Sequence, residues 1–118
     1  MGLLVLADAA GAQEAPRRTG ADRQVVVQLA YTLGEAHALR RLCAGPGEST
    51  WFGRMQRLES QEAADDAARA QLVESFNAGF AARQAQFVEC SRRSRATERA
   101  VAQRGAALAQ RLSADPQP

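Results

Sequence analysis

The spacing of the apolar side chains constrains this chain most, because they recur every three or four residues over long alanine-rich segments. This spacing places one apolar stripe along an α-helix, whereas a strand requires strict alternation. Alanine fills much of an apolar fraction of 46%, isoleucine is absent, and alanine favours helix over sheet. With 118 residues, the chain is long enough for one small domain. We therefore expect an all-α domain, without an apolar run of the ~20 residues that a membrane-spanning helix needs.

Four helical segments follow from the stripes and from the residues that start and stop helices. Asp22 is the expected N-cap of the first, and Ala-Gly-Pro-Gly at 44–47 stops it. Gly79 lies in the stripe of the third, where its cost in helix propensity suggests that another helix approaches closely. The four predicted segments are about 22–43, 51–61, 66–89 and 92–112.

The two cysteines, Cys43 and Cys90, each end a predicted helix on its apolar face. They form no CxxC pattern, and no further ligand stands near to complete a metal site. In a reducing compartment the thiols would stay apart, whereas an exported protein could pair them. A disulfide over so long a loop stabilises a fold by roughly 4 kcal/mol in the chain-entropy model. We favour the disulfide and expect a small four-helix antiparallel bundle, or hairpin, joined by Cys43–Cys90.

The N-terminal residues have some features of a secretory signal peptide. The small residues up to Ala12 resemble the site at which a signal peptide is cleaved. However, no basic residue precedes the apolar stretch, and Asp8 interrupts it. We interpret this segment as the remnant of a signal peptide whose true start lies upstream. The alternative is a disordered tail on a cytoplasmic protein. The predicted organisation is a signal-peptide remnant at 1–12, a flexible lead-in at 13–22, a helical domain at 23–112 and a disordered tail at 113–118.

All 15 basic residues are arginine. This fits either a GC-rich genome or recognition of phosphate and carboxylate groups. The net charge of +2 is too small to favour non-specific binding of nucleic acid, so we expect no such partner. Acidic residues gather in 58–77 and arginines in 91–112, which could face each other or leave the basic segment for a partner.

Two arginines, Arg40 and Arg83, fall inside apolar stripes. A guanidinium there must reach solvent, stack on a ring or pair with a carboxylate. One interpretation is a structural pair, and the other is that both line a cleft near His37 that accepts an anionic group. His37 has no positioned nucleophile or second titratable partner nearby, which favours a packed, hydrogen-bonded side chain over a catalytic one.

Trp51 and Phe52 follow the Gly-Pro-Gly turn, so one ring could be an exposed docking contact or both could enter the core. The sequence contains no phosphate-binding glycine loop, metal-ligand cluster or paired-carboxylate motif. We therefore expect no catalytic residues, no metal and no cofactor.

Three segments share spacing and residue types with a known family. They are LGEAHALRRLC at 33–43, Trp51 with RMQRLE at 54–59, and RAQLVESFNAGF at 69–80 followed by Gln84, Phe87 and Cys90. Here the chain resembles a family of small alphaproteobacterial proteins of unknown function, usually made with a signal sequence. The resemblance spans about residues 25–112 and implies export. It also implies that Cys43, Trp51, Asn77 and Cys90 belong to the family's pattern, but it supplies no activity.

These observations favour a non-enzymatic periplasmic module of the cell envelope that interacts with an envelope protein. Its docking surface would be the thin apolar stripe and arginine-rich face of residues 92–112. The alternative is a protein that binds a small anionic ligand near His37, Arg40 and Arg83, with Trp51 and Asn77 as further candidate binding residues. An exposed apolar patch on the last helix favours the first function, and a deep pocket at the two arginines favours the second.

Overall fold

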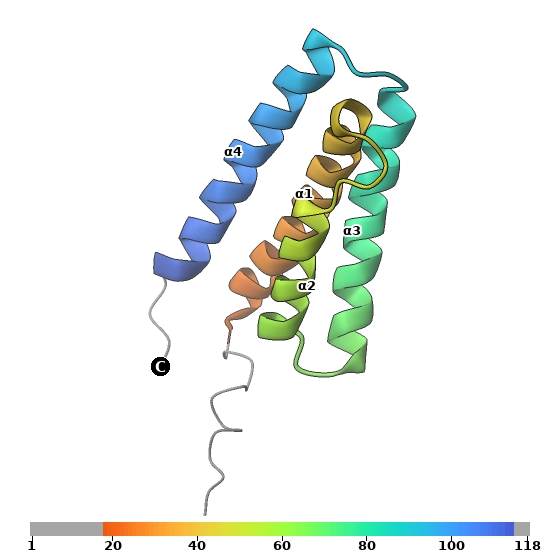
Figure 1. The fold of residues 1–118 in the computed structure, drawn as a ribbon. Helices are drawn as coiled ribbons and strands as arrows, with labels where there is room; N and C mark the ends of the chain where they lie inside the picture. Colours follow the sequence, from red (N-terminus) through yellow and green to blue (C-terminus); the bar gives the residue numbers. More distant parts are fainter. Residues whose placement is uncertain (1–17, 115–118) are drawn as a thin grey trace, which may run out of the picture.

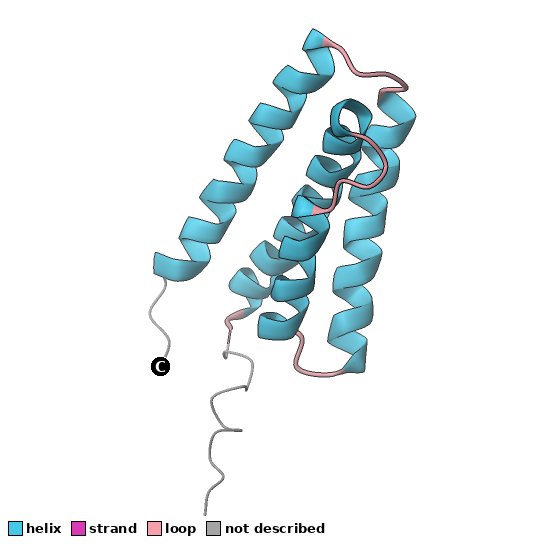
Figure 2. Cartoon of the chain, viewed as in Figure 1, coloured by secondary structure: helices cyan, strands magenta, loops and turns pink. Residues whose placement is uncertain are grey.

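The computed structural model describes residues 18–114, which form four helices joined by short loops (Figures 1 and 2). In chain order these are α1 (Gly20–Ala44), α2 (Thr50–Glu62), α3 (Asp66–Gln86) and α4 (Arg92–Ala114). Successive helices run in opposite directions (Figure 1). The predicted all-α fold of four helices is confirmed. The predicted signal-peptide remnant, residues 13–17 and residues 115–118 lie outside the described part.

The helix ends differ from the prediction by more than one residue at three places. α4 continues to Ala114, so Ser113 and Ala114 of the predicted disordered tail are helical. The other two places are the start of α1 and the end of α3. Thr19, not Asp22, is the N-cap of α1, and its hydroxyl accepts a hydrogen bond from the Asp22 amide at 3.0 Å. Residues 20–22 of the predicted lead-in are therefore helical, and the Asp22 carboxylate lies in the first turn, where the helix dipole favours a negative charge. At the other site, α3 ends at Gln86, because the chain turns at the buried Phe87.

The central element is α1, which packs against each of the other helices. Its buried side chains spread around most of its circumference between Thr32 and Leu39, so it has no solvent face there. Towards the end where α1 begins, it packs with Met55 and Leu58 of α2 and with Leu72 and Phe76 of α3. Towards its other end, the core contains Ala36, Leu39, Phe87 and Val101.

Two glycines allow α1 and α3 to touch backbone to backbone. A Cβ atom on Gly79 would lie 2.1 Å from the carbonyl oxygen of Tyr31, and one on Gly34 would lie 1.9 Å from that of Phe76. Real Cβ atoms essentially never approach so closely. The close approach predicted at Gly79 is therefore confirmed, and Gly34 is its counterpart on the opposing helix.

The predicted disulfide between Cys43 and Cys90 is present, with the two Cα atoms 4.9 Å apart. Cys43 lies in the last turn of α1, whereas Cys90 lies in the loop after α3 rather than at a helix end as expected. Successive helices are antiparallel as predicted, but Cys90 lies between α3, which is parallel to α1, and α4, which is antiparallel to it (Figure 1). Since α1 and α3 run in the same direction, their C-terminal ends meet at one end of the bundle, and the disulfide fixes them there (Figure 1).

None of the helices in residues 18–114 is long and apolar enough to cross a membrane.

Candidate functional site

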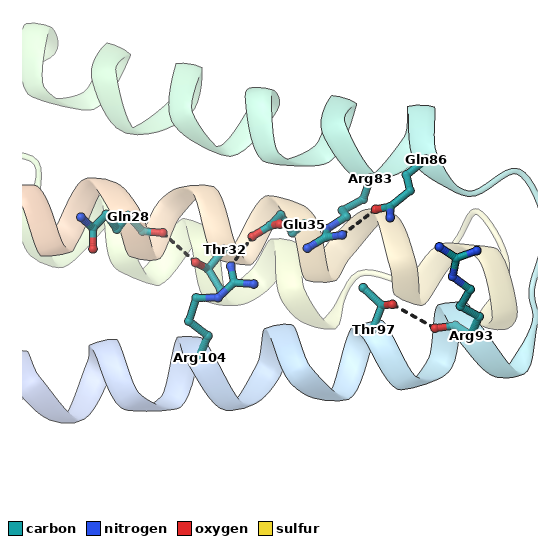
Figure 3. A network of polar contacts seen from close by, with 8 residues as sticks. All are labelled: Gln28, Thr32, Glu35, Arg83, Gln86, Arg93, Thr97 and Arg104. Carbon is teal, nitrogen blue, oxygen red and sulfur yellow. Dashed lines mark hydrogen bonds and ion pairs between the residues drawn. The ribbon is translucent and has the colours of Figure 1, made fainter.

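A buried carboxylate, Glu35, lies on α1 between two guanidinium groups from different helices. Arg83 of α3 donates from Nε to Oε2 at 2.8 Å, and Arg104 of α4 donates from Nη1 to Oε1 at 2.8 Å (Figure 3). The Glu35 side chain is 5% exposed, whereas that of Arg104 is 48% exposed. Arg83 therefore pairs with a carboxylate of the protein itself. Of its two interpretations, this agrees with the structural pair and not with a cleft that accepts an anion.

Arg40 is placed differently from Arg83. Its side chain is 44% exposed, and it lies 3.3 Å from the carboxylate of Glu98 and 4.0 Å from that of Glu48. The two arginines therefore face different carboxylates, one at the surface and one inside the bundle. The structure does not bring their guanidinium groups together to face a shared anion.

His37 lies in a cluster of aromatic rings. Its ring centroid is 5.4 Å from that of Phe80, 5.8 Å from that of Phe76 and 5.9 Å from that of Phe52. The expected packing is observed, but Nδ1 is buried and has no hydrogen-bond partner among the described residues, so the expected hydrogen bond is missing there. Burial lowers the pKa of His37, the positive charge of Arg41 lowers it further, and Glu48 opposes both.

Of the two aromatic residues after the turn, Phe52 is the exposed one, and it covers one side of the His37 ring. Trp51 is half-buried, its Nε1 has no acceptor among the described residues, and the Arg54 guanidinium lies 4.7 Å from its ring centroid. Asn77 is exposed on α3.

The predicted docking stripe on the last helix is not exposed. Val101 and Leu112 are buried and Leu108 is half-buried, because this side of α4 packs against α1. The expectation of an apolar docking stripe there was wrong. The apolar stripe of α4 is thin because this helix packs mainly against one neighbour, α1, and a single helix–helix contact needs few large side chains.

A different face of α4 lines an open groove beside α2, with a volume of about 260 Å³. We call it the α2–α4 groove. Its floor is formed by Leu29 and Leu33 of α1, and α2 supplies Trp51, Leu58 and the longer polar side chains. The wall on α4 consists only of small residues. The complete lining is Leu29, Leu33, Trp51, Arg54, Arg57, Leu58, Gln61, Ala102, Gly105, Ala106 and Ala109.

Among the predicted candidates, only Trp51 lies in this groove. The sequence signal for the rest was the recurrence of small residues at 102, 105, 106 and 109, which share one helix face. An alanine-rich helix has small residues on several faces, so this signal alone did not single the face out. The described residues contain no cluster of three or more His, Cys, Asp or Glu side chains that could hold a metal ion.

Comparison with known proteins gives one match. A family model described as a protein of unknown function (DUF2385) matches residues 22–115, which include all four helices apart from the first two residues of α1. No curated protein and no solved structure matches the chain.

Proposed function

Because this chain belongs to the DUF2385 family of proteins of unknown function, which supplies no activity, we propose a function from its own structure. The protein is a non-enzymatic interaction or accessory module of the cell envelope, and it docks a partner protein in the α2–α4 groove. The observation that carries this proposal is the groove itself, an open hollow between α2 and α4 with an apolar floor.

The packing of α4 explains why the groove is open. Contacts of α4 with the bundle are made chiefly to α1, and α2 likewise packs mainly on α1. Neither helix closes over the other, and they stand apart on the same side of the bundle (Figure 1). The small side chains of α4 keep this space free. An apolar channel with polar edges is the form that helix-binding grooves take in other protein interfaces.

Export to the periplasm is the second part of the proposal. The Cys43–Cys90 disulfide supports it, because such bonds persist in oxidising compartments and are rare in the cytosol. Cys43 is exposed, so a cytosolic reductant would reach the bond readily.

Binding of a small anion near His37, Arg40 and Arg83 ranks second. Arg83 already faces Glu35, and Arg40 already faces Glu48 and Glu98. An anion would have to displace a carboxylate from each arginine, which removes the main reason to expect such a cleft.

Site-directed photo-crosslinking in an alphaproteobacterial host tests the proposal. A photoreactive amino acid is placed in the tagged full chain at position 106, which lines the groove, and in a control at position 107, which does not. We expect one dominant envelope protein to be crosslinked from position 106 and not from 107, with the chain in the periplasmic fraction. Equal labelling from both positions, or a cytoplasmic location, would contradict the proposal.

A further inference from the structure

The charged residues that line the α2–α4 groove have one sign. Arg54 and Arg57 line it from α2, and among its described lining residues none is acidic. Neither arginine forms an ion pair within the described residues, although Arg54 lies over the Trp51 ring. On α4, Arg95 and Glu98 lie seven residues before Ala102 and Gly105, which places both on the same face. Glu98 pairs with Arg40, whereas Arg95 is exposed and forms no ion pair within the described residues. The groove therefore has an apolar floor and a positively charged border.

Five arginines elsewhere in residues 18–114 form ion pairs, whereas those at the groove border form none there, and neither do Arg23, Arg41, Arg92, Arg93, Arg99 and Arg111. Arg18, Arg40, Arg69, Arg83 and Arg104 all face carboxylates. Those at the groove border have no such partner among residues 18–114, so an acidic partner protein could supply their complementary charges. Opposite charges at an interface border increase the association rate and select against partners of the same sign.

The shape of the groove fits a helix. Its small-residue wall runs from Ala102 to Ala109, about two helical turns, and side chains of this size allow a second helix axis to approach closely. The Leu29 and Leu33 floor would meet the apolar stripe of the incoming helix. Such a helix would fill the place between α2 and α4 and complete the open side of the bundle.

We propose that the α2–α4 groove binds an acidic amphipathic helix of the partner protein, with its apolar face on Leu29, Leu33 and Leu58 and its carboxylates against Arg54, Arg57 and Arg95. This inference rests on the proposed function and adds the chemistry of the partner. A second copy of this chain is a weaker candidate, because each copy would bring the same positive border to the contact.

Two designed peptides without tryptophan test the proposal on the full chain. Both form a helix with leucine and alanine on one face, and the other positions are glutamate in one peptide and lysine in the other. Anisotropy of the labelled peptide gives the affinity, and emission of Trp51, the only tryptophan, reports occupation of the groove. We expect the glutamate peptide to bind about tenfold tighter than the lysine peptide at low salt and to shift the Trp51 emission.

Matched variants locate the binding. Ala106→Leu fills the groove and should lower the affinity for the glutamate peptide by about tenfold or more. Ala107→Leu on the same helix should leave this affinity unchanged. Arg54→Gln with Arg57→Gln should remove most of the preference for the glutamate peptide, while Arg111→Gln, on the opposite side of α4, should preserve it. Circular dichroism checks that each variant folds. If Ala106→Leu does not fold, the arginine variants still test the proposal.

The results that overturn this inference differ from those that overturn the proposed function. Equal or tighter binding of the lysine peptide would exclude an acidic partner, yet crosslinking from position 106 would still support docking. Absence of peptide binding together with concentration-dependent dimerisation that Ala106→Leu abolishes would assign the groove to a second copy. A Trp51 shift with dodecanoate and none with either peptide would assign it to an anionic amphiphile, and would overturn the inference as well.

Discussion

At the residue scale, the distance between α1 and α3 is set by Gly34 and Gly79, because a side chain on either would enter the backbone of the other helix. The sequence indicated only one of them. Gly79 lies between large aromatic residues of an apolar stripe, so a glycine there indicates a close contact. Gly34 lies near several alanines, from which it differs by only one methyl group, so the sequence gives no such signal there. Which helix approaches which is a property of the assembled bundle and could not be predicted from either segment alone.

Alanine substitutions test this contact. Gly34→Ala and Gly79→Ala should each lower the free energy of unfolding by about 1–3 kcal/mol or more, because the helices must move apart. Gly53→Ala is the matched control, since a Cβ there meets nothing within 4 Å. In the interior of α2 it should stabilise the protein by about 0.5–1 kcal/mol. Urea denaturation measures all three, and a neutral effect at Gly34 or Gly79 would contradict the close approach.

The His37 imidazole makes stability depend on pH. Its pKa is lowered in the folded chain, chiefly by burial, and returns to about 6.5 on unfolding. As the pH falls through 6.5, the unfolded chain therefore binds more protons than the folded chain, and stability decreases. Above about pH 7 this contribution is fully present. It is lost progressively as the pH falls from there to the lowered pKa of the folded state.

Denaturation between about pH 5 and 8 checks this dependence, with His37→Phe as the comparison. The substitution should abolish the decrease in stability. Glu48, whose pKa is also lowered, mainly by the Thr50 amide, adds stability that is lost only as the pH falls below its ordinary value of 4.5, outside this range. An unchanged slope in the variant would assign the dependence to another group.

At the scale of whole elements, the α3 and α4 helices are both tied to α1 through the Glu35 carboxylate. The sequence placed the four helices nearly correctly, because apolar stripes and strong stop signals are local features. It misplaced the start of α1, since Thr19 and Asp22 are both good caps and only one can serve. It extended α3 too far, because burial of Phe87, a long-range effect, ends that helix. Glu35 itself went unnoticed, since its importance depends on Arg83 and Arg104 reaching it from other helices.

Removing Glu35 should loosen the junction of the three helices. Glu35→Ala leaves the largely buried Arg83 without its carboxylate, and we expect a loss of about 3 kcal/mol in the free energy of unfolding. Arg104→Ala should cost at most about 1 kcal/mol, because that side chain is 48% exposed and solvent screens its pair. Glu98→Ala, which removes the nearer of the two carboxylates that face the exposed Arg40, is a second control with a similarly small cost. A smaller loss for Glu35→Ala than for Glu98→Ala would show that the buried pairs do not hold the helices.

At the scale of the whole molecule, the disulfide could be predicted from the sequence, whereas the groove could not. Cysteine usage and the predicted helix ends were enough to pair Cys43 with Cys90, although Cys90 lies in the loop after α3 rather than at a helix end. The groove could not be foreseen, because it depends on how far α2 and α4 stand apart on α1. Local periodicity contains no information about that separation, and of the predicted binding residues only Trp51 lies there.

Replacement of both cysteines measures the contribution of the disulfide. The double variant Cys43→Ala with Cys90→Ala leaves no free thiol and should lose about 4 kcal/mol, since the bond closes a loop with a sequence separation of 47. Urea denaturation of the oxidised chain and of the double variant gives the difference. Cys43 is exposed, so lost packing there contributes little. A difference below about 1 kcal/mol would contradict the loop-closure account of its stability.

The same bond divides the chain into a covalent ring and two open arms. Residues 43–90 form the ring, which holds α2 and α3, while most of α1 and all of α4 lie outside it. A protease that cuts within the ring, for example at the exposed turn after Pro46, leaves both pieces linked until a reductant is added. A cut within α4 instead releases a fragment directly. A single cut in the ring therefore leaves every side of the α2–α4 groove covalently joined. A cut in α4 can separate the α4 wall from the rest, and a cut in α1 between Leu33 and Cys43 separates the floor.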